Sequence, residues 1–176
     1  MDNQFVLRRA DMIDANALSG LCQTTFNETY VEDFFIPYPQ NDLDYYYRSS
    51  ASSESFAKKL ADPRCSLWVI EDKTNDELIA YAVVGPCDVD DIPHPNVQAN
   101  QDALLNRLYV QRDRRNHGFG QQLMHAILTW LEEHYSGRSI WLAVLLKKLQ
   151  STKVLCTLRF QQSWRIRLAC RKLERT

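Results

Sequence analysis

No apolar run in this 176-residue sequence approaches the roughly 18 residues that a membrane-spanning helix requires. Met1–Ala10 shows no charged stretch followed by an apolar one, which is the pattern of a secretory leader. We therefore expect a cytoplasmic protein without membrane association. The chain is long enough for one domain with a substantial core, and hydrophobic residues make up 45% of it, which is ordinary for a globular protein.

Paired cysteines are also missing. The five cysteines are odd in number and none stands in a C-x-x-C pair, which predicts a reducing compartment and argues against zinc. Between Cys87 and Gln101 the chain gathers several candidate metal ligands: Asp88, Asp90, Asp91 and His94. Their spacing is not that of a calcium loop, so we expect a solvated loop and no bound metal.

Charge is distributed unevenly along the chain, although the net charge is only −1. Leu145–Thr176 has nine basic residues and one acid, Glu174, which gives +8. Met1–Val144 has twelve basic and twenty-one acidic residues, which gives −9. An acidic body suits a cationic acceptor such as a polyamine or a lysine-bearing peptide, and we expect no nucleic-acid partner. The break near Val144 marks a change in the character of the chain.

Two of the five glycines stand in the stretch on which the other predictions depend, Asn106–Leu128. A short apolar strand ends at Leu108-Tyr109-Val110, a charged connection runs from Gln111 to Arg115, and Gly118 and Gly120 precede an amphipathic helix. Unpaired N–H groups and the helix dipole at such a site attract a diphosphate, and glycine lets it approach the backbone. A cationic side chain can assist from one of three positions: Arg112, Arg114 or Arg115.

The spacing Arg115-x-x-Gly118-x-Gly120 after this strand resembles the coenzyme A motif of the GNAT superfamily of N-acetyltransferases. The resemblance implies that the loop amides hold the acyl-CoA pyrophosphate and that the end of the strand pairs with pantetheine. It assigns acetyl-CoA as cosubstrate and the following residues to its binding: Leu108, Tyr109, Val110, Arg115, Asn116, His117, Gly118, Phe119, Gly120 and Gln121.

The remaining patterns predict alternating strands and helices. Strands are expected at Phe5–Arg9, Ser66–Glu71, Glu77–Pro86 and Ser139–Val144. Helices are expected at Met12–Thr25 (capped by Asp11), Ser52–Leu60, and from the glycine loop to about Tyr135. The first should bury Ile13, Ala17, Leu18, Leu21 and Cys22, and the last should bury Leu123, Ala126, Ile127, Trp130 and Leu131.

These elements match the GNAT superfamily from about Phe5 to Val144, and most resemble its bacterial polyamine-type members through T-F-N-E-T-Y, R-L-Y-V, N-H-G-F-G and I-W-L-A-V. The implied fold is α/β, with a mixed, strongly twisted central sheet flanked by helices. The aromatic stretch around Tyr30–Tyr47 favours packing, with a lid over the acceptor as the second interpretation. Tyr30 and Glu32 are the candidate acceptor-binding residues.

A general base is not evident. Related sequences often carry a carboxylate near Asn106, but an asparagine cannot accept a proton in this role. A water relay through Glu28, Glu32 or Tyr30 is one option. A backbone N–H in Leu108–Val110 is the expected donor to the oxyanion.

The resemblance stops after Val144, where the family has a helix with a candidate acid tyrosine and a closing hairpin. Leu145–Thr176 contains no Tyr and no Gly. When the segment is read from the second base of each codon, however, it permits that signature. In this frame the codon of Trp164 must yield Gly, that of Lys148 must yield Asn or Ser, and that of Lys153 must yield Lys or Arg. We therefore divide the chain into a GNAT-like region, 1–144, and an atypical basic segment, 145–176, which a frameshift would explain.

Two functions remain open. The first is an acetyl-CoA-dependent N-acetyltransferase acting on a primary amine of a small molecule or peptide. The second is a catalytically impaired acyl-CoA-binding or interaction protein with a basic tail, attracted to nucleic acid or anionic lipid. A homodimer is also open.

Overall fold

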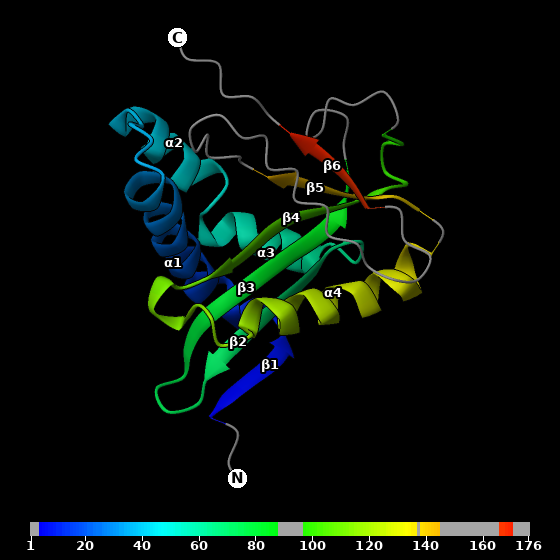
Figure 1. Cartoon of the computed structure of the whole chain (residues 1–176), viewed down its shortest axis with the longest axis horizontal. Helices are drawn as coiled ribbons and strands as arrows, with labels where there is room; N and C mark the ends of the chain where they lie inside the picture. The colour runs from blue at the N-terminus through cyan, green and yellow to red at the C-terminus, as the bar shows by residue number, and fades with distance from the viewer. Residues whose placement is uncertain (1–3, 88–96, 137, 145–165, 171–176) are drawn as a thin grey trace.

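A computed structural model describes residues 4–87, 97–136, 138–144 and 166–170, and its centre is a mixed six-stranded sheet in the order β1 to β6 (Figure 1). Neighbouring strands from β1 to β4 are antiparallel, whereas β5 runs parallel to β4 and β6 parallel to β5. The strands are β1 (Phe5–Arg9), β2 (Ser66–Asp72), β3 (Glu77–Pro86), β4 (Ala103–Val110), β5 (Ile140–Val144) and β6 (Ile166–Cys170). The predicted α/β class with a mixed sheet is confirmed.

Helices cover both faces of this sheet (Figure 1), with α4 on one face and α1 and α3 on the other. The α-helices are α1 (Ala15–Phe26), α2 (Gln40–Ser49), α3 (Ser53–Ala61) and α4 (Phe119–His134). Three shorter elements are the 3-10 turns η1 (Met12–Asp14) and η3 (Arg112–Arg114) and the π-helix η2 (Asn27–Asp33). The helix between β4 and β5 is the crossover that two parallel strands need.

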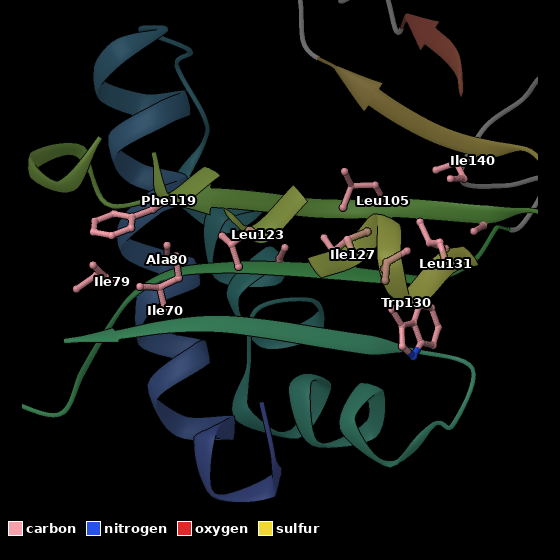
Figure 2. Packing of buried hydrophobic residues seen from close by; sticks show 13 residues of the cluster. Ile70, Ile79, Ala80, Leu105, Phe119, Leu123, Ile127, Trp130, Leu131 and Ile140 are labelled. Carbon is pink, nitrogen blue, oxygen red and sulfur yellow. The ribbon is translucent and has the colours of Figure 1, made fainter. Parts of the chain in front are cut away.

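The larger core lies between α4 and the sheet (Figure 2). All five residues predicted for the apolar face of α4 are buried: Leu123, Ala126, Ile127, Trp130 and Leu131. They meet alternate residues of the central strand, Ala80, Ala82 and Val84, whose side chains point to the same side of the sheet. Burial of a leucine or isoleucine here contributes about 1.5–3 kcal/mol, so this core fixes α4 against the sheet.

The opposite face packs against α1 and α3 through Leu18, Phe56 and Tyr81, all nearly inaccessible to solvent. The predicted burial of Ile13 and Ala17 is wrong, because Ile13 is 87% exposed and Ala17 is also exposed. Asp11 does cap the segment, but it caps the 3-10 turn η1, which has three residues per turn. The helical face counted from Met12 therefore does not continue into α1.

A polar network joins β1 to the start of this helical layer. The Arg8 guanidinium donates to Asp14 at 2.7 Å and also to Glu71. The hydrogen bond from Arg8 holds the pKa of Asp14 below its ordinary value. A carboxylate with a lowered folded-state pKa stabilises the fold above its unfolded pKa, near 3.9, and that contribution is lost as the pH falls through the folded pKa.

We therefore expect Asp14→Asn to lower the free energy of unfolding by about 1–2 kcal/mol at pH 7, because a charge-assisted hydrogen bond is lost. The deficit should shrink as the pH falls below about 4, because the carboxyl then takes up a proton in the unfolded wild type and its ionic contribution to stability is progressively lost. Urea unfolding of both proteins at pH 7 and pH 3 measures this. Glu54→Gln, in a pair exposed to solvent on both sides, should leave stability unchanged. A deficit that stays constant with pH would contradict the ionic explanation.

Candidate active site

The sheet splits between β4 and β5. Their pairing begins at Ala103 opposite Ile140 and ends at Leu105 opposite Leu142. Among the residues that the structure describes, Ala143 and Val144, the next residues of β5, pair with β6 alone. Within the described residues, β4 from 106 to 110 therefore has a strand neighbour on its β3 side alone. Every second residue of such an edge directs its N–H and C=O groups outward, where an extended ligand can pair with them.

This open edge leads through η3 to the N-terminus of α4. Gly118 is the N-cap of α4 and has a φ of +80°, and Asn116 is also left-handed at +66°. None of the N–H groups of residues 116–120 donates to a backbone or side-chain acceptor in the described part of the chain. Unsatisfied N–H groups and the positive end of the helix dipole together form an anion site.

The glycines of the loop fit a phosphate group. A Cβ added to Gly118 would meet no protein atom within 4 Å, so the space beside its backbone is open. A Cβ on Gly120 would lie 3.8 Å from the Leu108 side chain, which places the loop directly against β4. Because phosphate oxygens need close contact with N–H groups, this geometry fits the pyrophosphate of acetyl-CoA.

The side chains of the predicted cofactor loop point in different directions. Phe119 is 6% exposed, and its ring meets Phe5 with centroids 5.0 Å apart, so its side chain belongs to the core. His117 is exposed, and its Nδ1 lies 2.8 Å from the Arg115 carbonyl oxygen. Gln121 is exposed as well. Phe119 therefore offers only its backbone N–H to an anion, whereas His117 and Gln121 have exposed side chains.

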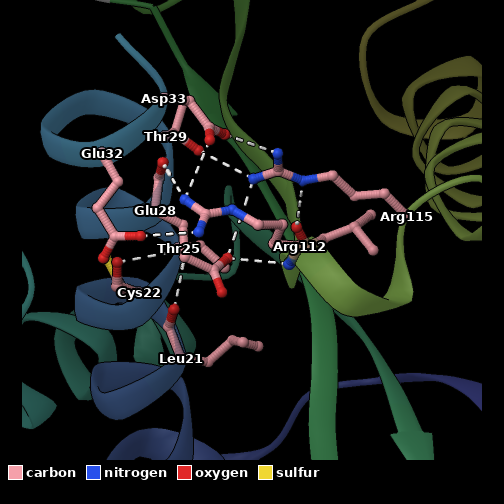
Figure 3. Close-up of polar contacts among 10 residues, drawn as sticks. Leu21, Cys22, Thr25, Glu28, Thr29, Glu32, Asp33, Arg112 and Arg115 are labelled. Atoms are coloured by element: carbon pink, nitrogen blue, oxygen red, sulfur yellow. Dashed lines mark hydrogen bonds and ion pairs between the residues drawn. The ribbon is translucent and has the colours of Figure 1, made fainter. Parts of the chain in front are cut away.

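The arginines before the loop contact η2 (Figure 3). The Arg112 guanidinium lies 2.7 Å from Glu32 and 3.0 Å from Asp33, and its backbone N–H donates to Glu28. Arg115 donates to Asp33 at 2.9 Å and lies 3.9 Å from Glu28. These five residues form an arginine–carboxylate network that ties η2 to the phosphate loop.

The sequence predicts a cationic side chain beside the phosphates from Arg112, Arg114 or Arg115, and that stays a prediction. Arg112 and Arg115 pair with carboxylates, and Arg114 lies 3.6 Å from Asp72. On the sequence alone, Glu28 and Glu32 are candidates only for a water relay or for binding the acceptor, and Asp33 is not included. Their spacing of four and five residues in a π-helix, which places them on one side, is the signal that was available.

Tyr30 and Tyr109 meet at the same end of β4, with their hydroxyl oxygens 2.7 Å apart. Burial and the neighbouring Tyr30 raise the pKa of Tyr109 above its ordinary value. The phenol of Tyr109 therefore remains protonated at neutral pH and can donate or relay a proton, but it cannot serve as a phenolate base.

The aromatic stretch is organised around Phe26. Its ring has centroid distances of 4.4 to 6.2 Å to four tyrosines: Tyr30, Tyr38, Tyr46 and Tyr47. Contacts of this kind support the packing interpretation for these rings. Phe35 and Tyr45 instead are 79% and 70% exposed.

The described part of the chain has neither a metal-ligand cluster nor a membrane-spanning helix. Among the described residues, no three His, Cys, Asp or Glu side chains gather as a metal site. The metal-site question for Asp88, Asp90, Asp91 and His94 lies outside those residues. In the same part of the chain, no helix has the length and apolar character needed to cross a bilayer.

Comparisons with known proteins agree with this geometry. Solved structures with the same fold include a GCN5-related N-acetyltransferase from Ralstonia eutropha (16% identity, TM-score 0.60, covering 90% of this chain and 99% of that one). A predicted acetyltransferase from Clostridium acetobutylicum, solved with acetyl-CoA, shares 20% identity with a TM-score of 0.56, covering 88% and 96% of the two chains. PaiA N-acetyltransferase from Thermoplasma acidophilum, solved with coenzyme A, shares 14% identity with a TM-score of 0.56. That match covers 73% of this chain and 72% of that one.

A search of curated proteins finds no match. The family model described as "Acetyltransferase (GNAT) family" matches residues 24–155, well over half of the chain. This match includes the last residues of α1, the open edge of β4, the phosphate loop and all of α4. The chain therefore belongs to the GNAT family of N-acetyltransferases, which use acetyl-CoA as cosubstrate.

Proposed function

We propose that the protein transfers the acetyl group of acetyl-CoA to a primary amine of a small molecule or peptide. The observation that carries this proposal is the continuity of the open edge of β4 with the unsatisfied N–H groups at 116–120. An extended pantetheine arm needs the first feature and a pyrophosphate needs the second. An edge without the anion site would favour peptide binding instead.

In this proposal the predicted strand and loop contribute chiefly backbone groups. The amides of Asn116, Gly118 and Gly120 bind the pyrophosphate, while the outward backbone groups of Leu108–Val110 pair with pantetheine. An outward N–H of that strand also donates to the tetrahedral oxyanion. Arg115 positions the loop through Asp33, in place of direct phosphate binding.

The reaction balances without a metal or a covalent enzyme intermediate. The acceptor ammonium first loses a proton to water, and the neutral nitrogen attacks the thioester carbonyl carbon. The C–N bond forms, the C–S bond breaks, and the nitrogen releases its second proton while the CoA thiolate takes one up. One proton is therefore released to solvent per turnover. The Tyr30–Tyr109 pair is a source of the proton for the thiolate.

A second candidate is a protein that binds acyl-CoA without turnover. One observation favours it: the three carboxylates that contact the arginines following β4, namely those of Glu28, Glu32 and Asp33, are all engaged in ion pairs. Among acceptors for the enzyme, a polyamine is supported by the net charge of −9 on residues 1–144.

The test combines binding with turnover. We expect acetyl-CoA to raise the melting temperature, and an amine panel to show thiol release with a matching acetylated product by mass spectrometry. CoA without the acetyl group should raise the melting temperature but give no product. Stabilisation by acetyl-CoA with no product from any amine would support the binding protein and contradict catalysis.

A further inference from the structure

A pocket of about 390 Å³ lies on the α3 side of the sheet. It is lined by Val83 of β3, which belongs to the core on the α1 and α3 side, by Leu104 of β4, and by Ser55 and Lys59 of α3. This volume is at the small end of the range for ligand sites in proteins, so the pocket suits a small molecule rather than a folded segment.

The pocket reaches the split in the sheet. Asn106, which also lines it, is the first residue of β4 beyond the pairing with β5. The pairing of β3 and β4 is irregular at this point, between Val83 and Val84, and a bulge of this kind re-aims a side chain. A molecule in the pocket therefore has access to an acetyl group carried along the open edge. This step rests on the proposed function.

The charges around the pocket favour one class of acceptor. Lys58 pairs with Glu54 at 2.9 Å in a largely exposed ion pair, and Asp62 binds Arg64 at 2.8 Å. Lys59, in contrast, is half-buried and forms no ion pair or hydrogen bond through its ammonium group within the described ranges. Among the charged groups that line this pocket, the Lys59 ammonium is therefore the one left without an ion pair or hydrogen bond in the described part of the chain, and the nearby Asp62 is already bound to Arg64.

We propose that this pocket binds the acceptor, and that the acceptor is a small amine that also carries a carboxylate, held by Lys59. The nitrogen to be acetylated then lies towards Asn106 and the open edge. The acidity of residues 1–144 points instead to cationic acceptors, but charges farther away than about 8–10 Å are screened at physiological salt. The nearby ammonium therefore decides the preference, and polyamines are disfavoured.

Three amines of equal length separate these alternatives: 5-aminopentanoate, pentylamine and 1,5-diaminopentane. Calorimetric titration into the protein saturated with CoA measures binding without turnover. We expect 5-aminopentanoate to bind about tenfold more tightly than pentylamine, because it gains one charge-assisted interaction with Lys59. The diamine should bind most weakly. Lys59→Met, which keeps the apolar stem, should remove the preference for the carboxylate.

Lys73→Met is the matched control, since it removes the same charge from the β2–β3 turn, where Lys73 pairs with Glu71. This variant should keep the preference. Any of four results would overturn the inference. They are equal binding of the three amines, tightest binding of the diamine, no detectable binding of any amine, and a carboxylate preference that survives in Lys59→Met. Turnover is measured separately: product from amines without any carboxylate preference leaves the proposed function intact, whereas carboxylate-dependent binding with no product contradicts only the proposed function.

Discussion

Replacement of Gly118 by valine is expected to weaken CoA binding at least about hundredfold, which corresponds to roughly 2.7 kcal/mol. The φ of +80° at this position is strained for any L side chain, most of all a β-branched one. A valine would either turn the loop N–H groups away or fill the open space beside them. Calorimetric titration of CoA measures the loss.

Gly20→Ala provides the control for this experiment. Gly20 lies within α1, and a Cβ there would meet nothing within 4 Å. The change should stabilise the fold by about 0.5–1 kcal/mol, because alanine loses less backbone entropy in a helix, and should leave CoA affinity unchanged. If folded Gly118→Val bound CoA as well as the wild type, the assignment of this loop to the pyrophosphate would fail.

Removal of the Asp102 carboxylate should give the largest loss of stability among the changes considered. Asp102 is 2% exposed, and its oxygens accept from the Trp141 indole at 2.8 Å and from the N–H groups of Gln98 and Ser139. Asp102→Ala leaves three donors unsatisfied at about 1–3 kcal/mol each, partly offset by relief of a buried charge. We expect a net loss of about 3 kcal/mol, or roughly 10 °C in melting temperature.

The consequence should extend to the active site, because Asp102 fixes the start of β5 beside Ala103, whose N–H donates to the Ser139 carbonyl oxygen. CoA affinity should therefore fall as well in Asp102→Ala. Asp113→Ala, at a side chain 76% exposed, should change stability by less than about 0.5 kcal/mol. Equal melting temperatures for the wild type and Asp102→Ala would show that the buried carboxylate does not hold β5.

Local patterns predicted the strands well. The ranges Phe5–Arg9 and Glu77–Pro86 match β1 and β3, because alternating or continuous apolar residues are bounded by polar turns. The start of β4 was placed too late, at Asn106 instead of Ala103. Asn100 and Asp102 are turn-forming residues directly before Ala103, so the signal for the earlier start was present in the sequence.

The candidate site was predictable only where it is local. Gly118, its helix and the preceding strand are adjacent in sequence, and the resemblance to a family motif located them together. Arg112 contacts Glu28, which lies 84 residues earlier in the sequence, and no short-range sequence pattern predicts such a pairing. The pocket at Lys59 likewise depends on α3 lying against β4, which is a property of tertiary packing.

The division of the chain after Val144 stays a prediction. Most of 145–176 lies outside the described residues, and the family model ends its match at residue 155. We propose that this segment is a frameshifted reading of the last helix and hairpin of the family. The nucleotide sequence across the codons for Val144–Thr176 decides between that proposal and a genuine basic tail. Whether the chain forms a homodimer is a further prediction, which sedimentation analysis can decide.

The open edge of β4 also affects how readily the protein aggregates in a crowded solution. A strand with free N–H and C=O groups along one side is a template for unwanted pairing with another chain, and natural proteins usually protect such borders. This one has to stay accessible, because the cosubstrate is proposed to use it. Bound acetyl-CoA would then cover the edge of the sheet as a neighbouring strand does. Depletion of the cosubstrate would therefore promote aggregation of the protein as well as stop turnover.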